Sequence, residues 1–246
     1  MEGTRINKYI AQSGSYSRRK ADQLILNGNV KVNGATMKSP GYIVVPSDMV
    51  EVNGIPQIPY TKKSYYAFNK PLGCITTMED DGGRFTVGDI IREAGLKVFP
   101  VGRLDYNTSG LLFLTNDGDF AYAVTHPKHE LEKVYLVRVS GFLSDSKLTK
   151  LRKGVDIGGF TTSPAKVNVV KQEKGSTVLE MTIHEGKNRQ VRKMIGAVGH
   201  QVRELKRIAI GNVKLGRLKE GSVRKLRQEE VKGLIGNSSK DRKSVV

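Results

Sequence analysis

The chain has 246 residues, of which 38% are hydrophobic, enough for the core of one large domain or of a small and a larger one. One cysteine, Cys74, excludes an internal disulfide framework and favours the reducing cytoplasm. No apolar run reaches the roughly 20 residues of a membrane helix, and no leader peptide is expected. Basic and acidic residues number 9 and 4 in residues 1–64, 15 and 15 in 65–186, and 17 and 5 in 187–246. Because basic surfaces attract polyanions, nucleic acid is the favoured partner and a membrane is not expected.

Residues 1–60 have the pattern of a small α+β domain. Apolar residues at helical spacing predict two helices, with Ser17 as the N-cap of the second. Alternating segments at 30–37 and 48–54 predict short strands, the first with an Asn-Gly turn. Basic residues lie off the apolar faces of the helices, so they form either one RNA-binding surface or an ordinary solvated face: Arg5, Lys8, Arg18, Arg19 and Lys20.

The remainder of the chain predicts a larger domain. Residues 53–64 contain two prolines and two lysines and predict a linker. Strands and helices then follow without the βαβ repeat of a parallel sheet. We expect an α+β fold with a mixed, mainly antiparallel sheet over 64–235, and a polar, disordered tail over 236–246. The predicted strands are 65–71, 111–115, 132–141, 164–172 and 176–186, and the predicted helices are 119–125, 144–154 and 188–200.

A lone acid stands in the stretch "VGRLDYNTSGLLFLTNDG", where Asp105 follows Arg103 and precedes an apolar strand. The small polar residues around Asp105 are typical of a turn, so Asp105 is either a turn residue or a catalytic carboxylate. Glycine-rich nucleotide loops and a nucleophile elbow are absent, and four histidines with one cysteine are a poor metal-ligand set, so no cofactor and no metal are expected. With Tyr135 and the arginines of 185–194, Asp105 would suit an enzyme that flips a base out of its stack.

The segment "GRLDYNTSGLLFLTNDG" resembles the central motif of the pseudouridine synthases of the RsuA/RluB group. Other motifs of that group are similar to "YYAFNKPLGCITT", "EKVYLVRVSG", "IHEGKNRQVRKM" and "LKRIAIGNVKLGRL", which stand in the right order. Near the N-terminus, "RINKYIAQSGSYSRRKADQLILNGNVKVNG" resembles the alpha-L RNA-binding domain first described in a small-subunit ribosomal protein. The resemblance spans about residues 4–232.

The resemblance implies a ribosomal RNA pseudouridine synthase, an isomerase that turns a flipped uridine into pseudouridine without a cofactor. It implies that Asp105 is the essential catalytic residue, that Tyr135 stacks on the base, and that Arg192 pairs with the aspartate. Helical spacing puts Arg192 at the edge of the buried stripe of its helix, whereas Arg189 and Lys193 share a more exposed face. The predicted substrate contacts are Lys70, Arg103, Lys187, Arg189, Lys193 and, beneath the base, Leu205.

The sequences of the motifs favour 23S ribosomal RNA as the substrate, either as free RNA or within a pre-ribosomal particle. We expect the enzyme to be a cytoplasmic monomer. The same chemistry on 16S ribosomal RNA is the runner-up. A non-catalytic rRNA-binding or ribosome-assembly factor is the first alternative of another class, and the intact set of Asp105, Tyr135 and Arg192 argues against it. A base-removing or phosphodiester-cleaving enzyme is the second, and no activated water or metal-binding carboxylates are evident for it.

Overall fold

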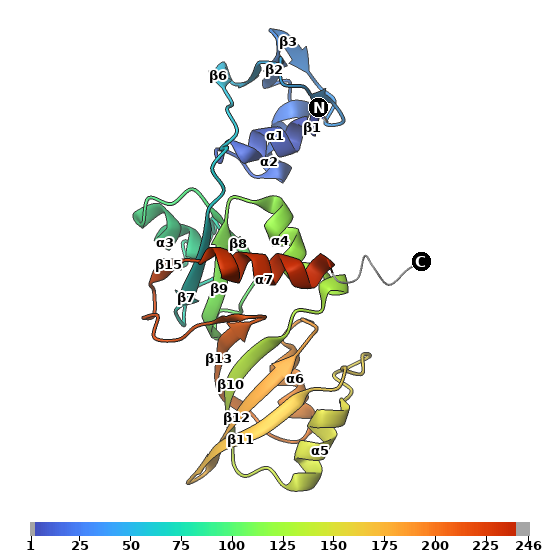
Figure 1. Ribbon diagram of the computed structural model, residues 1–246, viewed down its shortest axis with the longest axis vertical. Helices are drawn as coiled ribbons and strands as arrows, with labels where there is room; N and C mark the ends of the chain where they lie inside the picture. The colour runs from blue at the N-terminus through green and yellow to red at the C-terminus, as the bar shows by residue number, and fades with distance from the viewer. Residues whose placement is uncertain (1–2, 240–246) are drawn as a thin grey trace. The chain divides into compact units, whose positions relative to one another are not determined.

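The computed structural model describes residues 3–239 and divides the chain into two compact units, Met1–Ser64 and Tyr65–Val246 (Figure 1). Each unit has a hydrophobic core of its own. Within residues 3–239, no helix combines the length and the apolar character needed to cross a membrane.

The first unit is a small α+β domain in which two helices and short strands enclose one core. The predicted apolar faces are buried, with Ile10 and Ile25 at 0% exposure. Ser17 caps the second helix by accepting a hydrogen bond from the backbone N–H of Lys20. The sheets have the orders β3-β2-β5-β6 and β1-β4. The elements are β1 (Thr4–Arg5), α1 (Ile6–Gln12), α2 (Arg18–Leu26), β2 (Val30–Val32), β3 (Ala35–Met37), β4 (Ile43–Val44), β5 (Val50–Val52) and β6 (Ile55–Pro56).

The first two thirds of the predicted linker, residues 53–60, belong to this unit. β6 pairs with β5, and the backbone N–H of Tyr60 donates a 2.9 Å hydrogen bond to the carbonyl of Gln12. The side chain of Gln57 is 4% exposed and accepts a 2.7 Å hydrogen bond from the Ser13 hydroxyl. The linker interpretation is therefore wrong for residues 53–60, because a distant serine satisfies a polar side chain that the local pattern assigns to solvent.

The second unit is built on a nine-stranded sheet. Its main path is β11-β12-β10-β13-β9-β7-β15, with β14 on β13 and β8 on β9. Among these strands only β13 and β9 pair in parallel, which confirms the predicted α+β fold with a mainly antiparallel sheet. The strands are β7 (Tyr65–Lys70), β8 (Phe99–Val101), β9 (Ser109–Thr115), β10 (Lys133–Ser140), β11 (Lys166–Glu173), β12 (Ser176–Ile183), β13 (Val202–Ile210), β14 (Val213–Lys214) and β15 (Val223–Lys225).

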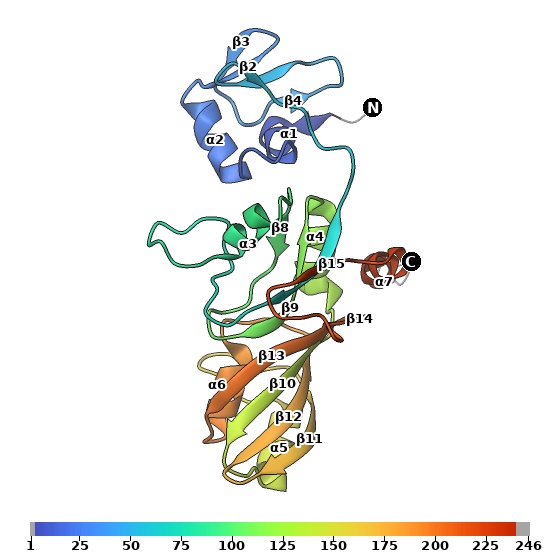
Figure 2. The same ribbon diagram turned by 90° about the vertical axis from the view of Figure 1, so that its left-hand side faces the viewer.

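Helices cover both faces of β9, which explains its uninterrupted apolar sequence. Leu112 and Leu114 face one core cluster with α3, whereas Leu111 and Phe113 face the other with α4 and α7. In Figure 2, α3 lies on one side of β9 and α4 on the other. The helices of this unit are α3 (Val87–Glu93), α4 (Gly118–Thr125), η1 (Pro127–His129), α5 (Asp145–Lys153), α6 (Gln190–Ala197) and α7 (Gln228–Ser239).

The predicted disordered tail begins too early. Helix α7 extends to Ser239, so residues 236–239 are helical, and 240–246 lie outside the described residues. Two buried residues explain why a polar segment folds here. Leu234 is 0% exposed in the core with α4, and Glu230 accepts hydrogen bonds of 2.8 and 2.9 Å from Arg224.

The parallel contact between β9 and β13 determines where the Asp105 loop enters the fold. Arg207 of β13 pairs with Gly110 of β9, and a Cβ atom on Gly110 would lie 2.2 Å from the carbonyl oxygen of Arg207. The φ of Gly110 is +105°, so glycine alone suits both the conformation and the close approach. Since the loop of residues 102–108 leads directly into β9, this contact fixes one end of the loop.

Candidate active site

The Asp105 loop connects β8 to β9 and is held by hydrogen bonds on several sides. The hydroxyl of Thr76 donates to the carbonyl of Leu104 at 2.7 Å and accepts from its N–H at 3.2 Å. The N–H of Gly73 donates to the carbonyl of Tyr106 at 3.0 Å, and the carbonyl of Asp105 accepts from Thr108 at 3.0 Å. Both neighbours of the half-buried Asp105 are thus bound to the segment 73–76, which limits the positions open to the carboxylate.

Lys70 stabilises the turn of residues 71–74, which contacts this loop. It is 0% exposed, and its ammonium donates to the carbonyls of Pro71 at 2.9 Å and Cys74 at 2.7 Å. Burial lowers the pKa of Lys70, and the carboxylates of Asp105 and Glu220 oppose that shift. The structure does not bring Lys70 to the cavity, because its ammonium is enclosed and bound to the turn that carries Gly73.

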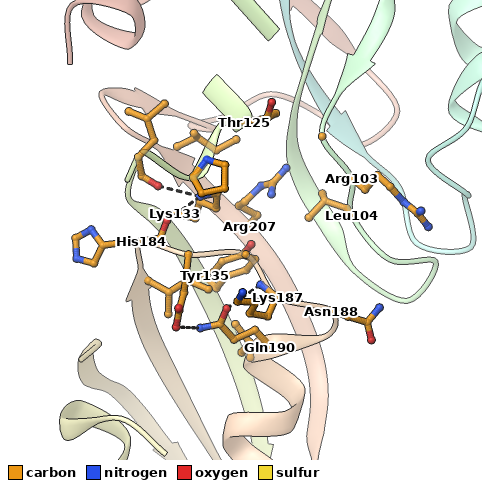
Figure 3. A pocket seen from close by; sticks show the side chains of 18 of the residues that line it. Arg103, Leu104, Thr125, Lys133, Tyr135, His184, Lys187, Asn188, Gln190 and Arg207 are labelled. Atoms are coloured by element: carbon orange, nitrogen blue, oxygen red, sulfur yellow. Dashed lines mark hydrogen bonds between the residues drawn. The ribbon is translucent and has the colours of Figure 1, made fainter. Parts of the chain in front are cut away.

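A cavity of about 670 Å³ adjoins the loop and is drawn in Figure 3. Its walls come from the Asp105 loop, the segment 124–133, β10, the segment 183–191 and β13. The structure brings six of the predicted site residues to this cavity, and they are Arg103, Asp105, Tyr135, Lys187, Arg189 and Leu205. Lys70, Arg192 and Lys193 are not among the residues that line it.

The floor of the cavity is the apolar face of the sheet around Tyr135. The Tyr135 side chain is 8% exposed and Leu205 is 6% exposed, and they lie on the neighbouring strands β10 and β13. In Figure 3 the Tyr135 ring lies in the middle of the pocket, with Lys187 and Gln190 on one side in this view and Lys133 and Arg207 on the other. A flat aromatic surface of this kind suits the face of a nucleobase.

Arg192 joins the Asp105 loop to the start of β13. Its Nη2 donates to the carbonyl of Asn107 at 2.6 Å, and its Nη1 donates to the carbonyl of Val202 at 3.3 Å. Burial and the charge of Arg189 lower the pKa of Arg192, while Asp105 raises it. Among residues 3–239, no ion pair within 4.0 Å joins Arg192 to Asp105, so the guanidinium attracts the carboxylate at longer range and holds the loop through its backbone.

The segment 184–190 forms a basic edge of the cavity. Buried Gln190 accepts from the backbone N–H of Lys187 at 3.0 Å and donates to Glu185 at 2.6 Å. The ammonium of Lys187 lies 4.5 Å from the ring centroid of Phe160. Arg189, with φ of +52°, and Lys193 are exposed, in agreement with the predicted exposed face, and Gln190 orders the segment that carries Lys187 and Arg189.

Sequence reasoning missed Lys133 and Arg207. Lys133 stands two residues before Tyr135 on one alternating strand, and Arg207 two residues after Leu205, so the period of two was the available signal. The ammonium of Lys133 donates to the carbonyls of Leu131 at 3.0 Å and His184 at 3.1 Å. Burial, with a smaller effect of Arg207, lowers the pKa of Lys133 to about 8.

The predicted RNA-binding residues of the first unit lie on β1, α1 and α2. Four of them are exposed and Lys8 is half-buried. The helix faces opposite to them contribute Ile6, Ile10 and Ile25 to the core. The exposed members are Arg5, Arg18, Arg19 and Lys20.

Comparison with known families agrees with both units. The model of the RNA pseudouridylate synthase family matches residues 64–197, and that of the S4 domain matches residues 4–50. The chain belongs to the RNA pseudouridylate synthase family. The resemblance to the RsuA/RluB group and the expectation of an enzyme are thereby confirmed at the level of the family.

Full-length relatives and a solved structure resemble this synthase throughout its length. It is 44% identical to an uncharacterized RNA pseudouridine synthase of Aquifex aeolicus, over 96% of this chain and 95% of the relative. It is 43% identical to the ribosomal large subunit pseudouridine synthase B of Bacillus subtilis, over 94% and 95% of the two chains. A crystal structure of a pseudouridylate synthase, 31% identical, superposes with a TM-score of 0.68 and covers 94% of this synthase and 99% of that chain.

Proposed function

We propose that this synthase converts one uridine of 23S ribosomal RNA to pseudouridine, with Asp105 as the essential residue. One observation carries the proposal: a half-buried carboxylate, on a loop held from both neighbouring residues, shares a cavity with a buried aromatic ring and an apolar side chain. The 43% identity to the Bacillus subtilis large-subunit enzyme over nearly the whole chain supports the choice of RNA.

The proposed reaction rearranges the nucleoside with no change in its atomic composition. The bond from N1 to C1′ breaks, uracil turns within the pocket, and C5 bonds to C1′. The proton leaves C5 while N1 gains one, so no redox partner is needed. Asp105 acts on the ribose, either by attack at C1′ or by removal of a ribose proton. Tyr135 stacks on the base and assists the proton transfer, and Leu205 supports the same ring from β13.

The charges around the cavity support an RNA substrate. Arg103, Lys187 and Arg189 are exposed cations on its wall and suit backbone phosphates, as do the basic residues of the first unit. The single buried cysteine suits the reducing cytoplasm, where ribosomal RNA is made.

The test of this function replaces Asp105 with Asn, which retains size and turn propensity but removes the charge. We expect tritium release from C5-labelled uridine in ribosomal RNA to fall below detection, with the RNA Kd and Tm little changed. Asp81→Asn, at an exposed position away from the cavity, is the matched control and should react normally. Near-normal release by the Asp105→Asn protein would contradict the proposed mechanism.

The alternatives make different predictions in a deletion strain. Loss of one pseudouridine from 23S RNA is the expected result, whereas loss from 16S RNA would assign the same chemistry to the small subunit. If the protein were a non-catalytic rRNA-binding or assembly factor, the modification map would stay complete. In that case Asp105→Asn would restore any assembly defect of the deletion strain. Under the proposed function, Asp105→Asn should not restore the missing pseudouridine.

A further inference from the structure

Two cations on the floor of the cavity lack a carboxylate partner. Arg207 is 5% exposed, and its Nε donates a 2.7 Å hydrogen bond to the carbonyl of Leu111. The half-buried Lys133 donates to the carbonyls of Leu131 and His184. No ion pair within 4.0 Å involves either cation among the residues that the structure describes.

The sheet places both cations beside the residues proposed to hold the base. Lys133 and Tyr135 are two positions apart on β10, so their side chains leave the same face. Arg207 pairs with Tyr135 across the ladder, and Leu205 precedes it by two residues on β13. The cavity floor therefore has an apolar part, made by Tyr135 and Leu205, next to a cationic part. In Figure 3, Lys133 and Arg207 lie close to each other above the Tyr135 ring.

Within residues 3–239, no carboxylate lies within ion-pair distance of either cation. The acidic residues on the cavity wall are Asp105, Glu130 and Glu185. Glu185 accepts hydrogen bonds from Gln190 at 2.6 Å and from the backbone of Ser163 at 2.9 Å. Two like charges with reduced hydration repel each other, and carbonyl dipoles compensate only part of the charge. A site with this arrangement is preorganised for an anion.

We propose that Lys133 and Arg207 bind a backbone phosphate of the target nucleotide and thereby position its base over Tyr135. The inference rests on the proposed function, because it takes RNA as the ligand. A nucleotide joins the flat face of a base to an anionic phosphate through one ribose, which corresponds to the two adjacent parts of this floor. Lys133 supplies a point charge and Arg207 a planar set of donors, one of them already used by Leu111. Both are positioning residues for the reaction.

The test is a double-mutant cycle between Lys133 and a single phosphate. The Kd is measured for an rRNA fragment that carries the unmodified target uridine. The protein has the Asp105→Asn substitution, so that turnover does not interfere. Lys133→Met should raise the Kd about tenfold and lower the salt slope by about one unit. A methylphosphonate, which is neutral, is placed 5′ or 3′ of the uridine. At one of these positions the effect of Lys133→Met should disappear.

The controls separate binding from folding. Lys166→Met removes an exposed lysine that is paired with Glu132 outside the cavity, and it should leave the Kd unchanged. Lys133→Arg should restore most of the affinity, and equal Tm values would show that the variants fold. Arg207 is not the primary variant, because its hydrogen bond to Leu111 also joins β13 to β9.

Three outcomes would overturn the inference. Equal Kd values for Lys133→Met and Lys166→Met would show that Lys133 makes no contact with the RNA. An undiminished effect of Lys133→Met on the Kd of both methylphosphonate RNAs would show that the charge of Lys133 acts on another part of the RNA. Competition by 10 mM inorganic phosphate, without any methylphosphonate effect, would assign the site to a free anion. Tritium release by the wild-type protein on the same RNA tests the proposed function separately.

Discussion

The guanidinium of Arg192 reaches the backbone carbonyl of Asn107, two residues after Asp105, across a hydrogen bond of 2.6 Å. A second hydrogen bond, to the carbonyl of Val202, ties the same side chain to β13. Arg192 thus connects the helix α6 with the Asp105 loop and with the strand that carries Leu205. No ion pair within 4.0 Å joins Arg192 to Asp105 among the described residues, so Arg192 acts on this loop through its backbone.

We predict that Arg192→Lys lowers the single-turnover rate at saturating RNA by about 10²-fold, or about 2.7 kcal/mol of transition-state stabilisation. Lysine keeps the charge but cannot donate to two carbonyls in the planar geometry of a guanidinium. The exposed cations Arg189 and Lys193 provide the matched controls. Arg189→Lys and Lys193→Arg should change mainly the Kd and its salt slope. A normal rate for Arg192→Lys together with a slow Arg189→Lys would mean that the wrong arginine has been assigned.

Gly110→Ala should destabilise the protein by about 2–4 kcal/mol and slow the reaction. Its φ of +105° disfavours alanine, and the added Cβ would meet the backbone of Arg207, so the start of β9 and the Asp105 loop must shift. Gly118→Ala is the control, because Gly118 begins α4 and a Cβ there has no neighbour within 4 Å. Urea unfolding measures the first effect and tritium release the second. Equal stability of the two variants would contradict the steric explanation.

Acid should remove the contribution of Glu230 to stability. Hydrogen bonds from Arg224 lower the pKa of this carboxyl from 4.5 to about 2, and its side chain is 6% exposed. A lowered pKa stabilises the folded state above pH 4.5, and the gain is lost as the pH falls toward 2. We expect Glu230→Gln to lower the free energy of unfolding by about 3 kcal/mol at pH 7, at 1.36 kcal/mol per unit of pKa.

The pH dependence identifies the cause of that loss. The difference between the wild type and Glu230→Gln should shrink in urea unfolding as the pH is lowered from 5 to 2.5. Glu229→Gln changes an exposed neighbour in the same turn of α7 and should be nearly neutral at every pH. A Glu230→Gln deficit that stays constant with pH would assign the effect to packing.

Neutralising Arg18, Arg19 and Lys20 together, each by Gln, should weaken rRNA binding and reduce the salt slope by about two to three units. These side chains are exposed at the start of α2, away from the core of the first unit. The Tm and the rate at saturating RNA should not change. A control carrying Lys31→Gln and Lys38→Gln alters exposed lysines of the same unit outside the helices. If both proteins lost affinity equally, the effect would be one of net charge.

Local patterns determined much of this structure. The alternation around Tyr135 predicted β10, the stripe of Val191, Met194 and Ile195 predicted the buried face of α6, and Ser17 predicted the start of α2. These features depend on residues within one or two turns, so a single sequence contains them. The Asp105 loop was recognisable for a similar reason, since its whole motif is contiguous.

Contacts between distant segments decided the rest. Gln57 is buried because Ser13, 44 residues away, binds it, and α7 is anchored by Leu234 in the core that it shares with α4. The strands that hold Lys133 and Arg207 became neighbours only when the sheet formed. Whether a polar side chain meets solvent, a carbonyl or a ligand depends on which segments fold over it, and the residues adjacent to it in sequence do not specify that.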